Sequence, residues 1–94
     1  MFIIYGKKRK KTGKSASRYL RANNKLPGIL YGNKKINISI ELDHDSVFNM
    51  LLKSDFYKIN FHLSLDNIKF LVTIKSVQRH AFKPKLLHID FLYV

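Results

Sequence analysis

The sequence predicts a compact, barrel-like α+β domain of about six short strands and two helices, in which strands predominate. Three observations support this fold class. Several segments alternate apolar and polar residues with period two, which is the pattern of strands that bury one face. Two other segments place apolar residues at helical spacing, and both are short. The chain has 94 residues, the size of one domain with a small core, and short strands must close or cover their edges.

The first quarter of the chain predicts a strand, a loop and a helix. Apolar residues 1–5 form a short strand, and the lysine-rich residues 6–13 follow as a loop that we expect to be mobile without its partner. A helix begins near Ser15, a good capping residue, and runs to about Asn24. Two asparagines and then Pro27-Gly28 end this helix, because these residues favour turns over helix.

Two strands and a second helix are predicted next. Residues 29–31 read as a short buried strand, and residues 36–42 as a half-buried one. Asp43 caps a helix that runs to about Lys53. Two apolar pairs at i, i+4 spacing would dock this helix on the core. The alternating strand residues are Ile36, Ile38, Ile40 and Leu42, and the helical pairs are Val47 with Leu51 and Phe48 with Leu52.

The second half of the chain predicts strands alone. Residues 57–65 alternate, and Asp66-Asn67 is a plausible tight turn because both residues tolerate positive φ. The return strand runs from residue 68 to about 79, residues 80–84 form a loop, and residues 87–93 form the last strand. Its inward-facing residues are Leu87, Ile89, Phe91 and Tyr93.

Positive charge is concentrated in the first 35 residues, which contain no acidic residue. Eleven of the 18 lysines and arginines lie there, whereas residues 36–94 carry a net charge of only +1. So dense a cluster of like charges repels itself unless an anion neutralises it, and a polyphosphate backbone is the commonest such partner. The charge distribution therefore favours a nucleic-acid-binding protein.

Composition excludes several other classes. Hydrophobic residues make up 46% of the chain, too many for a disordered basic tail. With no cysteine, disulfides and thiolate metal sites are excluded, and no apolar run reaches the roughly 18–20 residues of a membrane span. The four histidines lack metal-ligand spacing, and neither a nucleophile elbow nor a phosphate-binding glycine loop occurs. We expect a soluble cytoplasmic protein with no metal, no cofactor and no enzymatic activity.

The predicted first helix carries the sharpest candidate site. Lys14, Arg18, Arg21 and Lys25 fall within about 40° of one another on a helical wheel, and Leu20 lies opposite them. A solvated helix face would mix charges of both signs, so the absence of acids favours contact with RNA or DNA over a solvated surface.

Further candidates lie on the strands and in the basic loop. Tyr31 and Ser17 offer hydroxyls to sugar or phosphate, although Tyr31 reads equally well as a half-buried strand aromatic. If Ile89 and Phe91 face inward, their neighbours His88 and Asp90 face outward, where such groups can read base edges or 2′-hydroxyls. Because lysine outnumbers arginine 14 to 4, each arginine is a candidate for a planar, bidentate contact. These outward and bidentate candidates are Gln78, His88, Asp90, Arg9, Arg18, Arg21 and Arg79.

Five motifs occur in an order that resembles a known family. They are GKSASR at 13–18 with Leu20-Arg21, PGILYG at 27–32, ELDHD at 41–45, VQRH at 77–80, and KPKL at 83–86 with HIDF at 88–91. Together they resemble the short, single-domain form of the bacterial large-subunit ribosomal protein L-twenty-five family, which binds 5S rRNA. The likeness covers residues 1–94 as one domain.

The resemblance implies a mainly β fold, a small six-stranded, mostly antiparallel β-barrel with two short helices. It also implies a structural component of the large ribosomal subunit, monomeric when free, that binds the loop E region of 5S rRNA in the central protuberance. The alternative is an RNA-binding or RNA-chaperone protein that selects no particular RNA. Carried over by motif, the RNA contacts are Arg9, Lys14, Ser17, Arg18, Arg21, Tyr31, Gln78, Arg79, His88 and Asp90.

Overall fold

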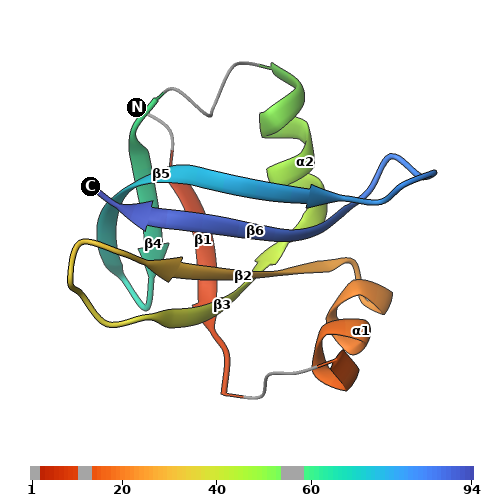
Figure 1. The fold of residues 1–94 in the computed structure, drawn as a ribbon, viewed down its shortest axis with the longest axis horizontal. Helices are drawn as coiled ribbons and strands as arrows, with labels where there is room; N and C mark the ends of the chain where they lie inside the picture. The colour runs from red at the N-terminus through yellow and green to blue at the C-terminus, as the bar shows by residue number, and fades with distance from the viewer. Residues whose placement is uncertain (1–2, 11–13, 54–58) are drawn as a thin grey trace.

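The computed structural model describes residues 3–10, 14–53 and 59–94, without the side chains of Lys14, Ser17 and Lys53 (Figure 1). The described residues form a barrel of strands with one helix at each of two places on its outside. In chain order the elements are β1 (Ile3–Lys8), α1 (Lys14–Ala22), β2 (Lys25–Tyr31), β3 (Ile38–Asp43), α2 (His44–Lys53), β4 (Phe61–Leu65), β5 (Ile68–Arg79) and β6 (Leu86–Tyr93).

The six strands close into a barrel in the order β1-β3-β2-β6-β5-β4, which confirms the predicted fold class. Four of the six pairings are antiparallel, and the β1–β4 and β2–β6 pairings are parallel. Each strand has a hydrogen-bonded neighbour on both sides over part of its length, so closure of the barrel covers much of the strand edges.

The barrel interior is filled by the apolar residues of the alternating segments. Phe61 and Phe91 are fully buried and meet edge to face, with ring centroids 6.0 Å apart. Inward-facing residues on β6 confirm the predicted alternation for Ile89 and Phe91, which leaves His88 and Asp90 on the outside. Other fully buried side chains are Leu26, Leu30, Ile40, Leu63, Leu65, Val72 and Leu86.

The turn between β4 and β5 forms as predicted. Asp66 and Asn67 both adopt positive φ, 50° and 66°, and the strand that follows runs from Ile68 to Arg79 as predicted. At the other end of β5, residues 80–85 form the loop predicted for 80–84. The last strand begins at Leu86 rather than Leu87, because a register shift pairs Arg79 with Leu86 and turns Leu86 into the core.

The loop predicted for residues 6–13 is wrong in its first part. Gly6, Lys7 and Lys8 continue β1 and pair with Leu42, Glu41 and Ile40 of β3. Backbone hydrogen bonds to β3 hold these residues in a strand and do not depend on their side chains. The lysine side chains therefore did not predict the strand. Residues 1–2 and 11–13, which the predicted strand and loop also included, lie outside the described residues.

β2 begins at Lys25, earlier than predicted, and includes the Pro27-Gly28 pair that the sequence predicts as a helix stop. The helix α1 ends at Ala22, and Asn24 takes φ 59°, as an asparagine at a helix end often does. Proline is tolerated in β2 because β6 pairs with this strand only from Gly28 onward. The absence of an N–H on Pro27 therefore costs no hydrogen bond to β6, because β6 does not pair with β2 at this position.

Three apolar residues expected to pack inward are exposed. Ile36 precedes the β2–β3 ladder, which starts at the Leu30–Ile38 pair, and its side chain is 81% exposed. Leu52 lies in the last turn of α2 and points to solvent, whereas Val47 and Leu51 pack on the core as predicted. Ile59 precedes β4, which begins only at Phe61. The predicted strand at 57–65 is therefore too long, and residues 54–58 lie outside the described residues.

The start of α2 ties three parts of the chain together. Asp43 caps the helix as predicted, since its Oδ2 accepts a hydrogen bond from the Ser46 backbone N–H at 3.1 Å. His44 is buried, stacks on Phe48, and accepts a hydrogen bond at Nε2 from the Leu86 N–H at 2.9 Å. Because Nε2 is an acceptor, the ring proton is on Nδ1. This Nδ1–H donates a hydrogen bond to Asp45 Oδ1 at 3.0 Å.

Asp45 gives stability a pH dependence. The pKa of its carboxyl lies below its ordinary value, chiefly because His44 donates a hydrogen bond to it and secondly because Asn24 does. A pKa that is lower in the folded state contributes stability above the unfolded pKa, and that stability is lost as pH falls through the folded pKa. We expect the melting temperature to fall as pH drops below about 4. Asp45→Asn should melt at a lower temperature than the parent at pH 7, and its melting temperature should fall less on acidification. Circular dichroism measures both. An equal fall of the melting temperature in the parent and in Asp45→Asn would contradict this.

Candidate nucleic-acid interface

The helix α1 places its arginines on the outside of the barrel. Leu20 is buried against the core, as predicted, while Arg18 is exposed and Arg21 is half-buried. None of the nine residues of α1 is acidic, so nothing in this helix neutralises its cations. The predicted stripe is wrong at one position, because Lys25 lies in β2, where it pairs with Asp43. Lys14 begins α1 and Ser17 lies within it, and the side chains of both are outside the described residues.

The end of α1 is joined to the start of β6 by a lysine. The ammonium of Lys85 donates a hydrogen bond to the Arg21 carbonyl at 3.3 Å, and that carbonyl lies in the last turn of the helix. A cation at this end of a helix is favoured by the helix dipole. The contact connects the last turn of α1 to the residue that precedes β6.

Across the neighbouring strands β2 and β6, three side chains form a small polar network. The carboxylate of Asp90 lies 2.9 Å from His88 Nδ1 and accepts a hydrogen bond from the Tyr31 hydroxyl at 3.4 Å. The pKa of Tyr31 is raised, chiefly by desolvation and then by the charge of Asp90, so this hydroxyl keeps its proton and acts as the donor. Tyr31 is half-buried, and its two predicted roles, a strand aromatic and a polar contact, are both compatible with this position.

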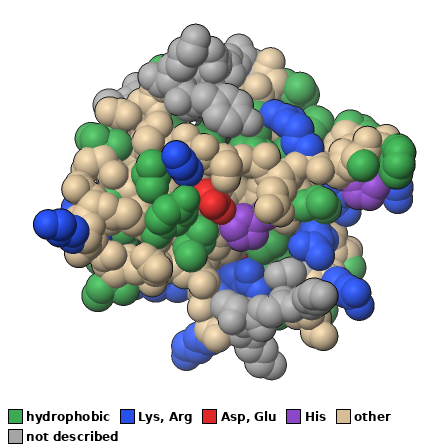
Figure 2. Space-filling view, viewed as in Figure 1, with side chains coloured by type: hydrophobic (Ala, Val, Ile, Leu, Met, Phe, Trp, Pro, Cys, Tyr) green, Lys and Arg blue, Asp and Glu red, His purple; other side chains and the backbone are tan. Residues whose placement is uncertain are grey.

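Gln78 and Arg79 lie beside this network at the end of β5. Gln78 pairs with His88 across the antiparallel ladder, and both Gln78 and Arg79 are exposed. Figure 2 shows the resulting surface, with an acidic and a histidine side chain together near the middle of the view and Lys or Arg side chains to the right and below. Polar and charged groups thus form one band from α1 across β6 to β5.

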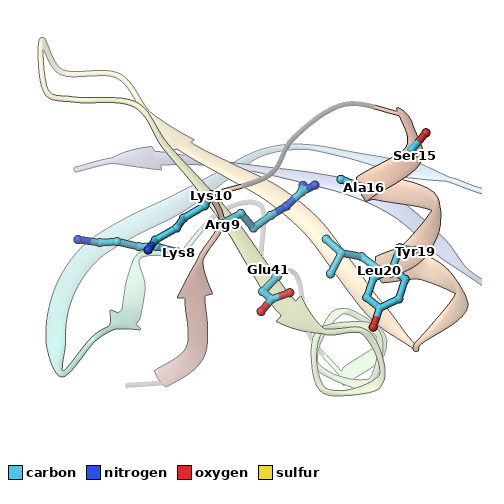
Figure 3. Close-up of a pocket in the computed structure, with 8 residues that line it drawn as sticks. All are labelled: Lys8, Arg9, Lys10, Ser15, Ala16, Tyr19, Leu20 and Glu41. Carbon is cyan, nitrogen blue, oxygen red and sulfur yellow. The ribbon is translucent and has the colours of Figure 1, made fainter.

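Arg9 lies apart from this band, in a groove of about 830 Å³ between the end of β1 and α1. In Figure 3 its guanidinium points across the groove toward Ala16. Its backbone N–H donates to the Ser39 carbonyl, whereas Nη2 is buried and has no hydrogen-bond partner among the described residues. Since β3 and β2 separate β1 from β6 in the barrel, Arg9 and His88 lie on opposite flanks of the surface that carries α1.

The structure therefore brings together Arg18, Arg21, Gln78, Arg79 and the Tyr31–His88–Asp90 network, and leaves Arg9 in a separate groove. The sequence indicated the basic run that contains Lys8 and Lys10 as a contact to phosphate, and both residues line that groove. Sequence reasoning missed Lys85, which connects the end of α1 to the residue before β6. Only the tertiary contact with the Arg21 carbonyl distinguishes Lys85 from an ordinary surface lysine.

Among residues 3–10, 14–53 and 59–94, no group of three or more histidines and acids is placed to hold a metal ion. Within the same part of the chain, neither helix has the length and apolar character needed to cross a membrane.

Comparison with known proteins agrees with the order of motifs in the sequence. The model of the ribosomal L25p family matches residues 4–91, which include the residues named above for the band and for the groove. The chain belongs to the ribosomal L25p family. Large ribosomal subunit protein bL25 of Buchnera aphidicola subsp. Schizaphis graminum (strain Sg) is 50% identical to this L25p-family chain over 93 residues. The similarity covers 99% of this L25p-family chain and 97% of that relative.

Proposed function

We propose that this L25p-family chain is a structural, non-catalytic component of the large ribosomal subunit that binds 5S rRNA in the loop E region of the central protuberance. Its relative in Buchnera is named as a large-subunit protein, and the family itself is a ribosomal one. The observation that carries the proposal is the band itself, in which a helix with no acids adjoins strands with outward polar groups. On this proposal the protein works in the cytoplasm, on the ribosome, and is a monomer when free.

The arginines of α1 supply affinity. Each cation that neutralises a phosphate releases a counterion, so binding tightens without regard to sequence and weakens as salt rises. Arg18 is exposed, and Arg21 is half-buried in the last turn of the helix. Arg9, Lys8 and Lys10 offer further cations from the groove on the other flank of α1.

Asp90 supplies a reason to expect selectivity. A carboxylate in a basic surface repels phosphate, so a surface built only to attract a polyanion would have no use for it. Held by His88 and Tyr31, the Asp90 carboxylate can instead accept hydrogen bonds from base amino groups or 2′-hydroxyls. Loop E is a run of irregular base pairs, and an irregular groove exposes such donors where a regular A-form helix does not.

A binding titration against 5S rRNA and against tRNA, each at low and at physiological salt, tests the proposal. We expect 5S binding to persist at physiological salt and in the presence of excess tRNA. The alternative, a general RNA-binding or RNA-chaperone protein, predicts equal affinity for both RNAs and a parallel loss as salt rises. That result would overturn the 5S proposal.

Asp90→Asn separates the two functions within the same titration. A purely electrostatic binder should bind both RNAs more tightly after the loss of a negative charge. A 5S-selective binder should lose about 1–3 kcal/mol toward 5S rRNA, the usual cost of one lost base-edge contact, and should not lose affinity for tRNA. Stronger binding of Asp90→Asn to both RNAs would contradict recognition through this carboxylate.

A further inference from the structure

The hairpin loop between β5 and β6, residues 80–85, extends away from the barrel (Figure 1). At its end Phe82 is 94% exposed, more than any other large hydrophobic residue among those described. Single exposed apolar residues are common on protein surfaces, so exposure alone assigns this ring no role. The hydrogen bonds within the loop and the cations beside the ring are what indicate a role for Phe82.

The loop holds Phe82 in a defined position. His80 Nδ1 accepts hydrogen bonds from the backbone N–H groups of Phe82 and Lys83, both at 3.1 Å. The rings of His80 and Phe82 lie 6.4 Å apart in an edge contact. The His80 N–H donates to the Lys85 carbonyl at 2.8 Å, which closes the base of the loop. A loop with this much internal bonding presents its aromatic ring without the entropy cost of ordering it upon binding.

A tight turn at Pro84 completes the loop. The Lys85 N–H donates to the Lys83 carbonyl at 2.7 Å, which is the hydrogen bond of a γ-turn centred on Pro84. Proline fixes φ near the value such a turn requires. The ring at position 82 is therefore flanked on its C-terminal side by a rigid segment carrying Lys83 and Lys85.

The charged residues of the hairpin itself are of one sign, and the acidic Asp45 of α2 lies near Lys85 at its base. Residues 67–89 contain five cations and no acidic residue, so they form a second basic segment within the chain. Arg79 at the base of the hairpin belongs to the candidate interface, and Lys85 contacts the end of α1. The hairpin is thus continuous with the band on two sides. A flat apolar ring among cations suits a nucleobase next to phosphates better than it suits an apolar protein pocket.

We propose that Phe82 stacks on an unpaired base of the same RNA that α1 contacts, with Arg79 and Lys83 on the phosphates next to that base. Proteins recognise unstacked bases in RNA loops and bulges by placing an aromatic ring on the base face. This assignment rests on the proposed RNA-binding function, and it adds a stacking contact that the charge pattern and the motifs did not indicate.

The test compares Phe82→Ala, Phe82→Leu and Phe82→Trp in titrations with 5S rRNA, with Arg18→Ala as the reference for an electrostatic contact. Because Phe82 is exposed, none of its replacements should change the melting temperature. We expect Phe82→Ala to weaken binding roughly 5- to 150-fold, the loss of one base–aromatic stack, with no change in the salt slope. Phe82→Leu should lose nearly as much, since leucine keeps an apolar side chain without a flat ring.

Phe82→Trp should bind as tightly as the parent, and its tryptophan would be the only one in the chain. Its fluorescence should be quenched at saturation if a base stacks on it. Parent-like affinity of Phe82→Ala or Phe82→Leu, or unquenched Phe82→Trp in the complex, would overturn the stacking proposal. If Arg18→Ala is weakened in the same experiment, the RNA-binding function stands and only the hairpin contact fails. If the parent itself does not prefer 5S rRNA to tRNA, the proposed function fails first.

Discussion

Arg18→Ala is expected to weaken binding to 5S rRNA by roughly 5- to 30-fold at physiological salt and to leave the melting temperature unchanged. Arg18 is exposed on α1 and makes no contact with the core, so its loss should remove a phosphate contact and little else. The slope of log affinity against log salt should decrease by about one, since one fewer counterion is released. Filter binding or fluorescence anisotropy at several salt concentrations measures both quantities.

Lys69→Ala is the matched control for this charge loss. Lys69 is exposed and lies at the end of β5 opposite Arg79, next to the turn that joins β4 to β5. The Lys69→Ala substitution removes one positive charge far from the band, so it should weaken RNA binding only slightly, through general electrostatics. If Arg18→Ala and Lys69→Ala weaken binding equally, the cationic face of α1 has no specific place in the complex.

His44→Ala is expected to give the largest loss of stability among the changes considered, about 2–4 kcal/mol. The substitution leaves the buried Leu86 N–H without its acceptor and removes the ring that stacks on Phe48. It also removes the donor to Asp45. For a domain of this size the melting temperature should drop on the order of 10–25 °C, measured by calorimetry or by circular dichroism.

A partial rescue and a control separate the hydrogen bond of His44 from its packing. His44→Gln keeps an oxygen able to accept from the Leu86 N–H, so it should lose clearly less stability than His44→Ala. His62 is half-buried on the outer side of β4, and its replacement by alanine should change stability by about 0.5 kcal/mol or less. Equal stability of the parent and His44→Ala would show that the hydrogen bond between His44 and Leu86 does not contribute to the stability of the fold.

The sequence predicted the parts of the fold that depend on local pattern. The Asp66-Asn67 turn, the extent of β5 and the cap of α2 by Asp43 all follow from short-range chemistry, and all are confirmed. Pattern failed where a neighbouring strand decides. Lys7 and Lys8 are strand residues because β3 lies beside them, and Pro27 is tolerated because β6 does not yet pair with β2 at that point. These facts belong to the barrel and cannot be read from either segment alone.

The candidate site divides in the same way. Charge and helical spacing indicated Arg18 and Arg21, and strand alternation indicated His88 and Asp90 as outward pairs. The contact between Tyr31 and Asp90 joins residues from two strands that are parallel neighbours, and no local pattern encodes that pairing. The role of His44 was missed for the same reason, since its acceptor function depends on an N–H that lies far along the chain, at Leu86.

The two parallel pairings of the barrel have a consequence for how the protein folds. Ile3 pairs with His62 and Gly28 with Ile89, so each pairing closes a loop of roughly sixty residues. Chains dominated by such non-local contacts fold slowly, on the order of milliseconds to seconds, because the entropy of loop closure opposes every early step. Tyr31 and Asp90 meet only when the second of these loops has closed. The proposed recognition of RNA through that pair therefore requires the loop to have closed, and we expect deletion of β6 to abolish it.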